Sequence, residues 1–197
     1  MTDWTALRYA VVDVEGNGQQ PPDLVELATV PIVGGIIGEP VSWLVKPDEP
    51  ISPMATRIHG LRNRDVADAP VFAEVENAVM AALDGSVLVA HNAHVDVDVL
   101  RRKLPGWECP EVFDTLKLAR RLLPGQASYR LGALVDAFKL ADGLPADLTP
   151  HRATYDALVT ARLFIHLATA SGAGPLSLEE LRGDSPGGGG DEAPALF

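Results

Sequence analysis

Three apolar stretches joined by short, turn-rich segments occupy the first 46 residues of the chain. Residues 8–14, 24–33 and 41–46 have the composition of β-strands, and the intervening "EGNGQQPPD" and "GGIIGEP" are rich in glycine and proline. Connections this short favour antiparallel neighbours, because a parallel pair needs a crossover of about a dozen residues or more. The pattern therefore predicts an antiparallel meander at the start of the fold.

Helical and strand patterns alternate after this meander. A short helix is predicted over residues 51–61 and a longer one over 71–83, followed by the apolar strand "SVLVAH". A strand reached by a helical crossover is usually parallel to its neighbour and buried on both faces. The segment "VFDTLKLARRLLP" predicts a brief strand and a helix, and "SYRLGALVDAFKL" and residues 151–171 predict two more helices. The fold class is therefore α/β, a mixed five-stranded sheet of antiparallel meander plus parallel strands, flanked by helices.

The size and composition of the chain fit one folded domain followed by a tail. Its 197 residues are 47% hydrophobic and 22% charged, which is ordinary for a globular protein. From Gly172 onward glycine and proline dominate, and "GDSPGGGGDEAP" cannot build a core. We expect a domain over residues 1–172 and a flexible acidic tail over residues 173–197.

Composition also narrows the location and the partners. No apolar run is long enough to span a membrane, and the N-terminus lacks a basic segment followed by an apolar one. We therefore expect a cytoplasmic protein with no membrane partner. The single Cys109 has no histidine beside it in sequence, so we expect an inert thiol. A net charge of −11 argues against adhesion to nucleic acid over the whole surface. This net charge does not exclude a local basic groove. The segments that could form one are "LRNR" (61–64), "RRK" (101–103) and "KLARR" (117–121).

Two carboxylates stand one residue apart where the first apolar stretch ends. In "YAVVDVEGNG" Asp13 and Glu15 lie on the same face of the expected strand. Burying an ionised carboxylate without a partner is costly, so the pair is either exposed to water or held by a positive group. Oxygen ligands on one face suit a divalent cation such as magnesium or manganese. The alternative, favoured for this stretch alone, is a strand ending in a polar turn supplied by Gly16 and Gly18.

Two later stretches add carboxylates and histidines. "LVAHNAHVDVDVLRR" brings Asp96 and Asp98 into an apolar segment whose periodicity fits either a strand with a wet face or a helix. "HRATYDALVTARLF" places His151 just before a helix and Asp156 on the small-residue face that should meet the sheet. A carboxylate on an inward face needs a partner, either an arginine in the core or a metal ion.

The order of these stretches resembles a known enzyme family. An Asp-x-Glu pair at a first strand end, "HNAHVD" after an interior strand and "HRATYD" at a late helix are similar to the DEDDh family of 3′–5′ exonucleases, which have an RNase H-like fold. The proofreading subunit of bacterial DNA polymerase III, RNase T and oligoribonuclease belong to this family. "LVELATV", "RIHGL" and "VFDT" extend the resemblance over roughly residues 8–170.

The resemblance implies a reaction and a set of catalytic residues. The expected reaction is hydrolysis of phosphodiester bonds by a two-metal mechanism, releasing nucleoside monophosphates from the 3′ end of single-stranded nucleic acid, with DNA favoured. Asp13, Glu15, Asp96 and Asp156 would share two Mg²⁺ or Mn²⁺ ions, and His151 would be the general base. Asp98 competes with Asp96, but the motif spacing favours Asp96. Glu26 and Asp114 also stand at family-like positions, and we expect both to be structural or to support the metal ligands rather than to bind metal themselves.

Substrate contacts are also implied by the resemblance, from Val14, Gly16, Asn17, His59, Asn92 and Arg130. "EGNG" stands where the family usually has Glu-Thr-Thr-Gly, so backbone amides rather than threonine hydroxyls would hold the terminal nucleotide. Other basic candidates are Arg57, Arg62, Arg101, Arg102 and Lys103. Aromatic candidates for base stacking are Trp43, Trp107, Tyr129 and Tyr155, with core packing as the alternative for the tryptophans. We expect His91, His94 and His166 to form hydrogen bonds or pack rather than bind metal.

Alternatives to DNA trimming remain at this stage. An RNA-trimming exoribonuclease or an oligoribonuclease-like enzyme would use the same acids and histidine. A non-catalytic nucleic-acid-binding module could keep the fold, although it would have no need for all five reactive groups. The expected partners are 3′ ends of single-stranded DNA or RNA, with a DNA polymerase or a sliding clamp as further candidates. The final "APALF" weakly resembles clamp-docking peptides, but an unstructured terminus is favoured.

Overall fold

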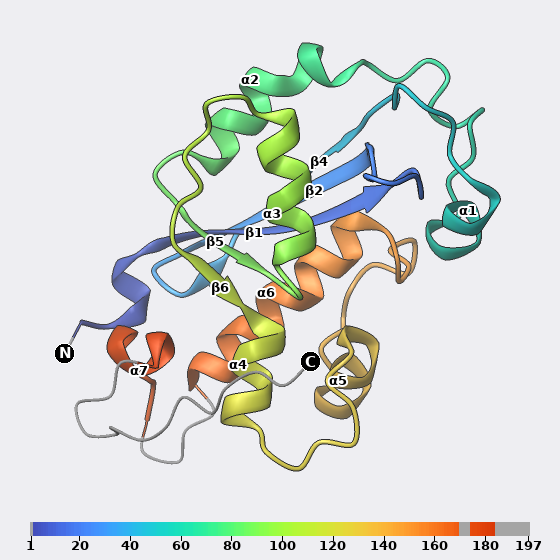
Figure 1. The fold of residues 1–197 in the computed structure, drawn as a ribbon. Coiled ribbons are helices and arrows are strands. Elements are labelled where there is room, and N and C mark those ends of the chain that lie inside the picture. The colour runs from blue at the N-terminus through green and yellow to red at the C-terminus, as the bar shows by residue number, and fades with distance from the viewer. Residues whose placement is uncertain (1, 170–173, 184–197) are drawn as a thin grey trace, which may run out of the picture.

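The computed structural model describes residues 2–169 and 174–183. Within these ranges six strands form one mixed sheet of order β3-β2-β1-β5-β6, with β4 also paired to β2. Their bounds are Arg8–Gly16 (β1), Leu24–Val33 (β2), Ile36–Ile37 (β3), Val41–Leu44 (β4), Val87–Ala90 (β5) and Val112–Asp114 (β6). Strands β1 to β4 pair antiparallel, and β5 and β6 join in parallel (Figure 1). The predicted mixed sheet is thereby confirmed.

The sheet has one strand more than the sequence predicted. The extra strand is β3, a two-residue segment that pairs with the end of β2, where Val33 lies opposite Ile36. Gly34 and Gly35 have φ values of 60° and 77°, the left-handed conformation that a two-residue hairpin turn requires. The glycine-rich sequence predicts a turn over this whole stretch, because a strand of two residues is too short to show periodicity.

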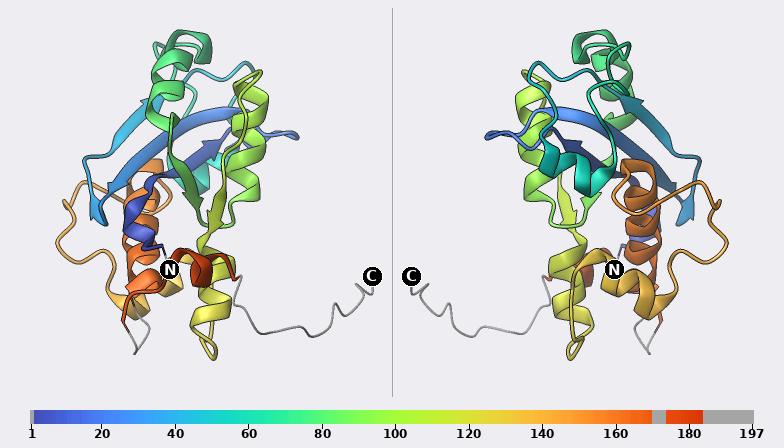
Figure 2. Two further views of the ribbon diagram at one scale, coloured as in Figure 1. Left: turned by 90° about the vertical axis from the view of Figure 1, so that its left-hand side faces the viewer. Right: turned by 90° about the vertical axis from the view of Figure 1, so that its right-hand side faces the viewer.

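Helices cover both faces of this sheet (Figure 2). Their bounds are Trp4–Ala6 (η1, a 3₁₀ turn), Pro53–His59 (α1), Phe72–Leu83 (α2), His94–Lys103 (α3), Thr115–Leu122 (α4), Leu131–Phe138 (α5), Ala153–Thr169 (α6) and Leu178–Arg182 (α7). Helices α2 and α3 pack on one face, and α4 to α7 pack on the other. None of the helices in the described part of the chain has the length and apolarity needed to cross a lipid bilayer.

Alternation along β1 decides which side chains face which helical layer. Tyr9 and Val11 pack in the core under α6, whereas Ala10 and Val12 pack in the core under α2 and α3. Because side chains two residues apart share a face, the next members of the first row, Asp13 and Glu15, also face the α6 side.

Helix α6 lies close against the sheet along its small-residue face. Ala153, Ala157 and Ala161 have no exposed surface, and they belong to the same core as Phe164 and Leu167. The apolar face predicted for residues 151–171 is thus confirmed. Small side chains let the helix approach β1 and β2, which brings its first turn to the carboxylates at the end of β1.

The folded domain continues past the boundary expected at residue 172. Ser177 and Glu180 form a capping box that starts α7, and Leu178 and Leu181 of that helix are buried in the core. Two guanidinium bonds from Arg121 end the helix, to the carbonyls of Glu180 (2.9 Å) and Leu181 (2.6 Å). The expected flexible tail therefore differs from the structure over residues 174–183. The rest of that tail, residues 184–197 with "APALF", lies outside the described residues.

Candidate active site

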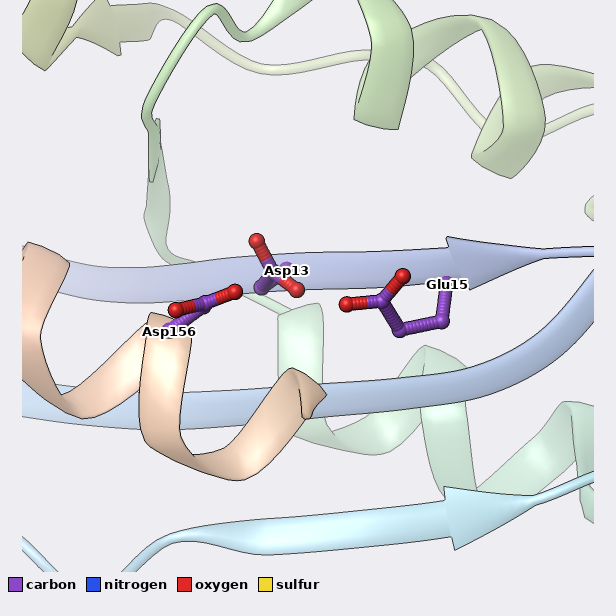
Figure 3. A group of neighbouring side chains, drawn as sticks. All are labelled: Asp13, Glu15 and Asp156. Atoms are coloured by element: carbon purple, nitrogen blue, oxygen red, sulfur yellow. The ribbon is translucent and has the colours of Figure 1, made fainter. Parts of the chain in front are cut away.

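Three carboxylates converge where β1 ends beside the first turn of α6. Oxygen atoms of Asp13, Glu15 and Asp156 lie within 4.8 Å of one another (Figure 3). Asp13 Oδ2 is buried and has no hydrogen-bond partner among the described residues. A buried oxygen of this kind is costly unless something positive faces it. The three side chains therefore fit a divalent cation, for which carboxylate oxygens are preferred ligands.

The fourth predicted ligand, Asp96, lies beside this group rather than within it. It sits in the first turn of α3 with 5% of its surface exposed, and its Oδ1 accepts a hydrogen bond from the Val14 amide (3.1 Å). The negative charge of Asp96 raises the pKa of Asp13. This effect shows that the two carboxylates are close neighbours. Asp98, the competitor, is exposed and lines a separate cavity between α3 and α4. The structure thus places Asp96, and not Asp98, next to the cluster.

Burial and mutual repulsion disfavour ionisation of all the clustered acids. Burial raises the pKa of Glu15 and of Asp96 to about 8, and that of Asp156 to about 6. The pKa of Asp13 is raised well above its usual range by burial and then by the charges of its acidic neighbours. Only protons or a cation can relieve such a cluster, and near neutral pH a divalent ion would do so while keeping the acids ionised.

His151 stands at the edge of the cluster, immediately before α6. Its side chain is exposed, and its backbone amide donates to Asp156 Oδ2 (3.1 Å). The residue has φ 62°, a left-handed conformation that costs a non-glycine residue about 1 kcal/mol or more. Such a conformation persists only when the surroundings hold it, and the contacts of the next two residues show how.

The residues after His151 are fixed by one buried acid on β2. Glu26 is 5% exposed and accepts bonds from Arg152 Nε (2.9 Å), Arg152 Nη2 (2.6 Å) and the Ala153 amide (3.0 Å). These contacts all serve the residues after His151, so Glu26 supports the fold around the cluster rather than joining the three converging carboxylates, as expected. The sequence predicts a core arginine or a metal ion as the partner of Asp156 but does not point to Arg152. Its position between His151 and Ala153 was the available signal, but its partner is 126 residues away.

The turn after β1 is built by a buried asparagine. Asn17 has no exposed surface, and its Oδ1 accepts from the amides of Gln19 (3.1 Å) and Asp23 (2.9 Å). Its Nδ2 donates to the carbonyl of Glu49 (3.2 Å). The side chain is therefore committed to the turn and presents no surface to a nucleotide, which leaves the neighbouring backbone as the means of contact.

His59 supports the same turn from α1. The Leu61 amide donates to Nδ1 (3.1 Å), so Nε2 carries the proton and faces the carbonyl of Gly16 (3.3 Å). Burial lowers the pKa of this imidazole, which keeps it neutral. Val14 is half-buried and packs toward α2 and α3. The side chains of Asn17 and His59 thus shape the turn, whereas Val14 packs against the core.

A cleft of about 750 Å³ opens beside the cluster. Its lining includes Asp13, Asp156 and His151 together with Arg120, Arg130 and Tyr155. Asn92 and Tyr129 also line it, next to His91, whose Nε2 donates to the Tyr129 carbonyl (3.0 Å). Of the aromatic candidates, the two tyrosines reach the cleft, whereas Trp43 and Trp107 pack against the core. The cleft therefore combines acids, cations and aromatic rings.

The other basic candidates have different neighbours. Arg102 donates to the carbonyl of Pro22 (2.8 Å) and Lys103 pairs with Asp23, so both hold the turn after β1. Arg101 lines the second cavity, of about 790 Å³, between α3 and α4. Arg57 and Arg62 are exposed. The remaining predicted structural residues behave as expected: Asp114 caps α4 through the Leu116 amide, and His166 packs on Phe138 at 4.4 Å between ring centroids.

Comparisons with known proteins point to one enzyme family. A family model described as Exonuclease (RNase_T) matches residues 10–164. Exodeoxyribonuclease 10 of Escherichia coli K12 is 41% identical over 163 residues, covering 82% of this chain and 69% of that protein. The 3′-5′ exonuclease DinG of Bacillus subtilis 168 is 33% identical over 167 residues, which cover 81% of this chain and 17% of DinG.

Solved structures also resemble this one. Exonuclease X in complex with 5′ overhanging duplex DNA has a TM-score of 0.71 at 38% sequence identity, over 88% of this chain and 98% of that chain. Escherichia coli exonuclease I in complex with a dT13 oligonucleotide has a TM-score of 0.68 at 19% identity, over 83% of this chain and 41% of that chain. The second likeness concerns the fold alone.

Proposed function

Because this chain belongs to the RNase_T family of exonucleases and is a 3′–5′ exonuclease, we propose that it trims single-stranded DNA from the 3′ end. The products would be nucleoside monophosphates, and the reaction would depend on divalent metal ions. The observation that carries this proposal is the convergence of Asp13, Glu15 and Asp156, with Asp13 Oδ2 buried and unpaired among the described residues, at the edge of a cleft.

The metal ions would be Mg²⁺ or Mn²⁺, two in each site. Asp13, Glu15 and Asp156 would hold them, with Asp96 as the fourth ligand from α3. When bound, such ions neutralise charge on the phosphate and activate water. The acids fit this role because their raised pKa values express the lack of a positive partner.

The chain's own groups would bind and orient the substrate and move the proton. His151 is exposed at the edge of the cleft and can accept a proton from the attacking water. Arg120 and Arg130 supply positive charge to the phosphodiester backbone. The rings of Tyr129 and Tyr155 offer stacking surfaces, worth about 1–3 kcal/mol per base in single-strand binding.

The choice of DNA over RNA rests on the named relatives. One relative is an exodeoxyribonuclease, and exonuclease X was solved with DNA. RNA trimming and oligoribonuclease-like activity would use the same acids, so they are outcomes of the test. The cytoplasmic location and the pairing with a polymerase or sliding clamp stay predictions.

The proposal is tested by following matched 5′-labelled single-stranded DNA and RNA of several lengths. Purified protein with Mg²⁺ or Mn²⁺ should shorten the DNA progressively from its 3′ end, and excess chelator should stop the reaction. An Asp13→Asn variant purified in the same way controls for contaminating nucleases. Preference for RNA or for very short oligonucleotides would replace the DNA assignment. Metal-independent cleavage, or no shortening of any substrate, would refute the proposal.

A further inference from the structure

One ion pair ties the middle of the sheet to the start of α6. Arg152 presents two guanidinium nitrogens to the two carboxylate oxygens of Glu26, at 2.9 Å and 2.6 Å. Glu26 also accepts from the Ala153 amide at 3.0 Å. Bidentate pairs of this kind restrict orientation as well as distance, because the planar guanidinium must lie along the carboxylate.

These contacts surround the catalytic end of the helix. His151 is held through its amide by Asp156, whereas Arg152 and Ala153 are held by Glu26. The Asp156 contact involves a carboxylate that a metal ion would also engage. The Glu26 contacts involve none of the converging carboxylates, so they can hold the left-handed His151 whether or not metal is present.

The position of Glu26 in the sheet relates the helix to the other ligands. Glu26 lies directly opposite Glu15 in the pairing of β1 with β2. Opposite residues of an antiparallel pair share a face, with their Cβ atoms about 5 Å apart. The pair therefore anchors the first turn of α6, with Asp156, to the same rung of the sheet that carries Glu15.

We propose that Glu26 and Arg152 are positioning residues, which fix His151 and Asp156 relative to the acids of β1 so that the chemical step is fast. This inference rests on the proposed function, since it assigns His151 as proton acceptor and Asp156 as metal ligand. Neither positioning residue is assigned a contact with substrate. Their loss should therefore lower the turnover rate rather than the affinity for DNA.

The principal variant is Arg152→Lys, which keeps the charge but loses the planar fork. We expect kcat on labelled single-stranded DNA to fall about 10- to 100-fold, the effect of misplacing a catalytic group by about 1 Å. KM, and the dissociation constant for DNA measured in chelator, should stay unchanged. Glu26→Gln, which keeps the shape of the side chain, should show the same division between kcat and KM.

Arg182→Lys is the matched control. Arg182 forms an equally short bidentate pair with Glu111, at 2.7 Å for both bonds, on an exposed surface at α7. Its kcat should equal that of the unmodified protein. An unchanged kcat in Arg152→Lys would overturn the inference. A fall in its kcat no larger than the fraction of that variant found unfolded in a thermal melt would also overturn it.

A second measurement does not depend on activity. The chain has five histidines, so their ring resonances can be assigned by single substitution in metal-free protein. In Arg152→Lys the His151 resonance should shift and broaden while those of His91 and His94 stay in place. An unmoved His151 resonance would contradict the positioning role. If the unmodified protein proved inactive, the proposed function would fail, and this measurement would still decide whether the pair orders His151.

Discussion

Asp96 and Asp98 lie two residues apart on α3, and the helix directs their identical side chains to opposite sides. Consecutive residues of an α-helix are rotated by about 100°, so residues two apart point in nearly opposite directions. Asp96 is buried beside β1 and accepts the Val14 amide, whereas Asp98 is exposed. The strand alternative would have placed both on one face, and the sequence pattern alone allowed either.

This separation predicts opposite outcomes for two conservative substitutions. Asp96→Asn should lower kcat/KM on single-stranded DNA by at least about 100-fold, because metal ions contribute several kcal/mol to the transition state. Asp98→Asn should leave kcat/KM unchanged. Initial rates with labelled oligonucleotide and saturating Mg²⁺ measure both, and circular dichroism confirms that each variant is folded. The reverse result would assign the ligand role to Asp98.

Asn17 carries a prediction about stability rather than catalysis. Asn17→Ala removes the acceptor of two amides and the donor to Glu49. Buried groups left without partners cost about 1–3 kcal/mol each, so the free energy of unfolding should fall by about 2–4 kcal/mol. Urea titration measures this change. Gln20→Ala, at an exposed neighbour in the same turn, serves as the comparison and should have no effect. Equal stability of the two variants would show that the Asn17 bonds contribute nothing.

At the scale of elements, the sequence predicted the segments that are long or have clear periodicity. Helix α2, the small-residue face of α6 and the parallel strand β5 follow from spacing and from apolar runs. Strand β3 and helix α7 were missed, because two and five residues are too few to establish a period. Helix α7 forms because of tertiary contacts, since Leu178 and Leu181 join a core that the rest of the chain provides.

The docking of α7 predicts that its buried leucine stabilises the whole domain. Leu181 is 1% exposed, so Leu181→Ala should lower the free energy of unfolding by about 2–5 kcal/mol. Ile36→Ala, at a side chain that is 73% exposed on β3, is the matched control and should change it by less than about 0.5 kcal/mol. Chemical denaturation of the two variants gives the comparison. A Leu181→Ala variant as stable as the control would mean that α7 is not part of the cooperative unit.

At the scale of the molecule, the sequence supplied the acids and the histidine but not their supports. Asp13, Glu15 and Asp156 were predicted from two short motifs and Asp96 from a third, because chemistry restricts residue type at those positions. The partner of Glu26 and the buried bonds of Asn17 depend on segments brought together only by the fold. Motifs therefore predicted the acids that the fold brings together, and long-range pairing determined what holds them.

The acidic cluster also predicts how stability depends on pH. The folded-state pKa values of Glu15 and Asp96 are about 8, against ordinary values of 4.5 and 3.8. Between those limits the folded state binds more protons than the unfolded state, so stability falls as pH rises. His59 and His91 have lowered pKa values and are neutral above about pH 7 in both states, so they do not oppose this trend there.

In chelator, the thermal midpoint should therefore decrease from about pH 7 to pH 8 and level off above this range, because there the folded state has lost the same protons as the unfolded state. Mg²⁺ at about 100 times its dissociation constant should add about 2.7 kcal/mol and raise the midpoint by roughly 5–10 °C. Scanning calorimetry with and without Mg²⁺ measures both effects. Asp13→Asn, which weakens the proposed site, should respond less to the metal. A midpoint that metal does not change would argue against the site.

The distance in sequence between Glu26 and Arg152 has a consequence for synthesis of the protein. The two residues are separated by 126 positions, and α6 follows every strand of the described sheet. Closing a loop of this length costs conformational entropy, and contacts between such distant residues slow folding. A growing polypeptide would thus carry Asp13 and Glu15 outside the ribosome long before His151 and Asp156 are translated. With His151 and Asp156 in their proposed roles, we expect the nuclease to be inert while it is being made and to gain the ability to cut nucleic acid only when α6 docks.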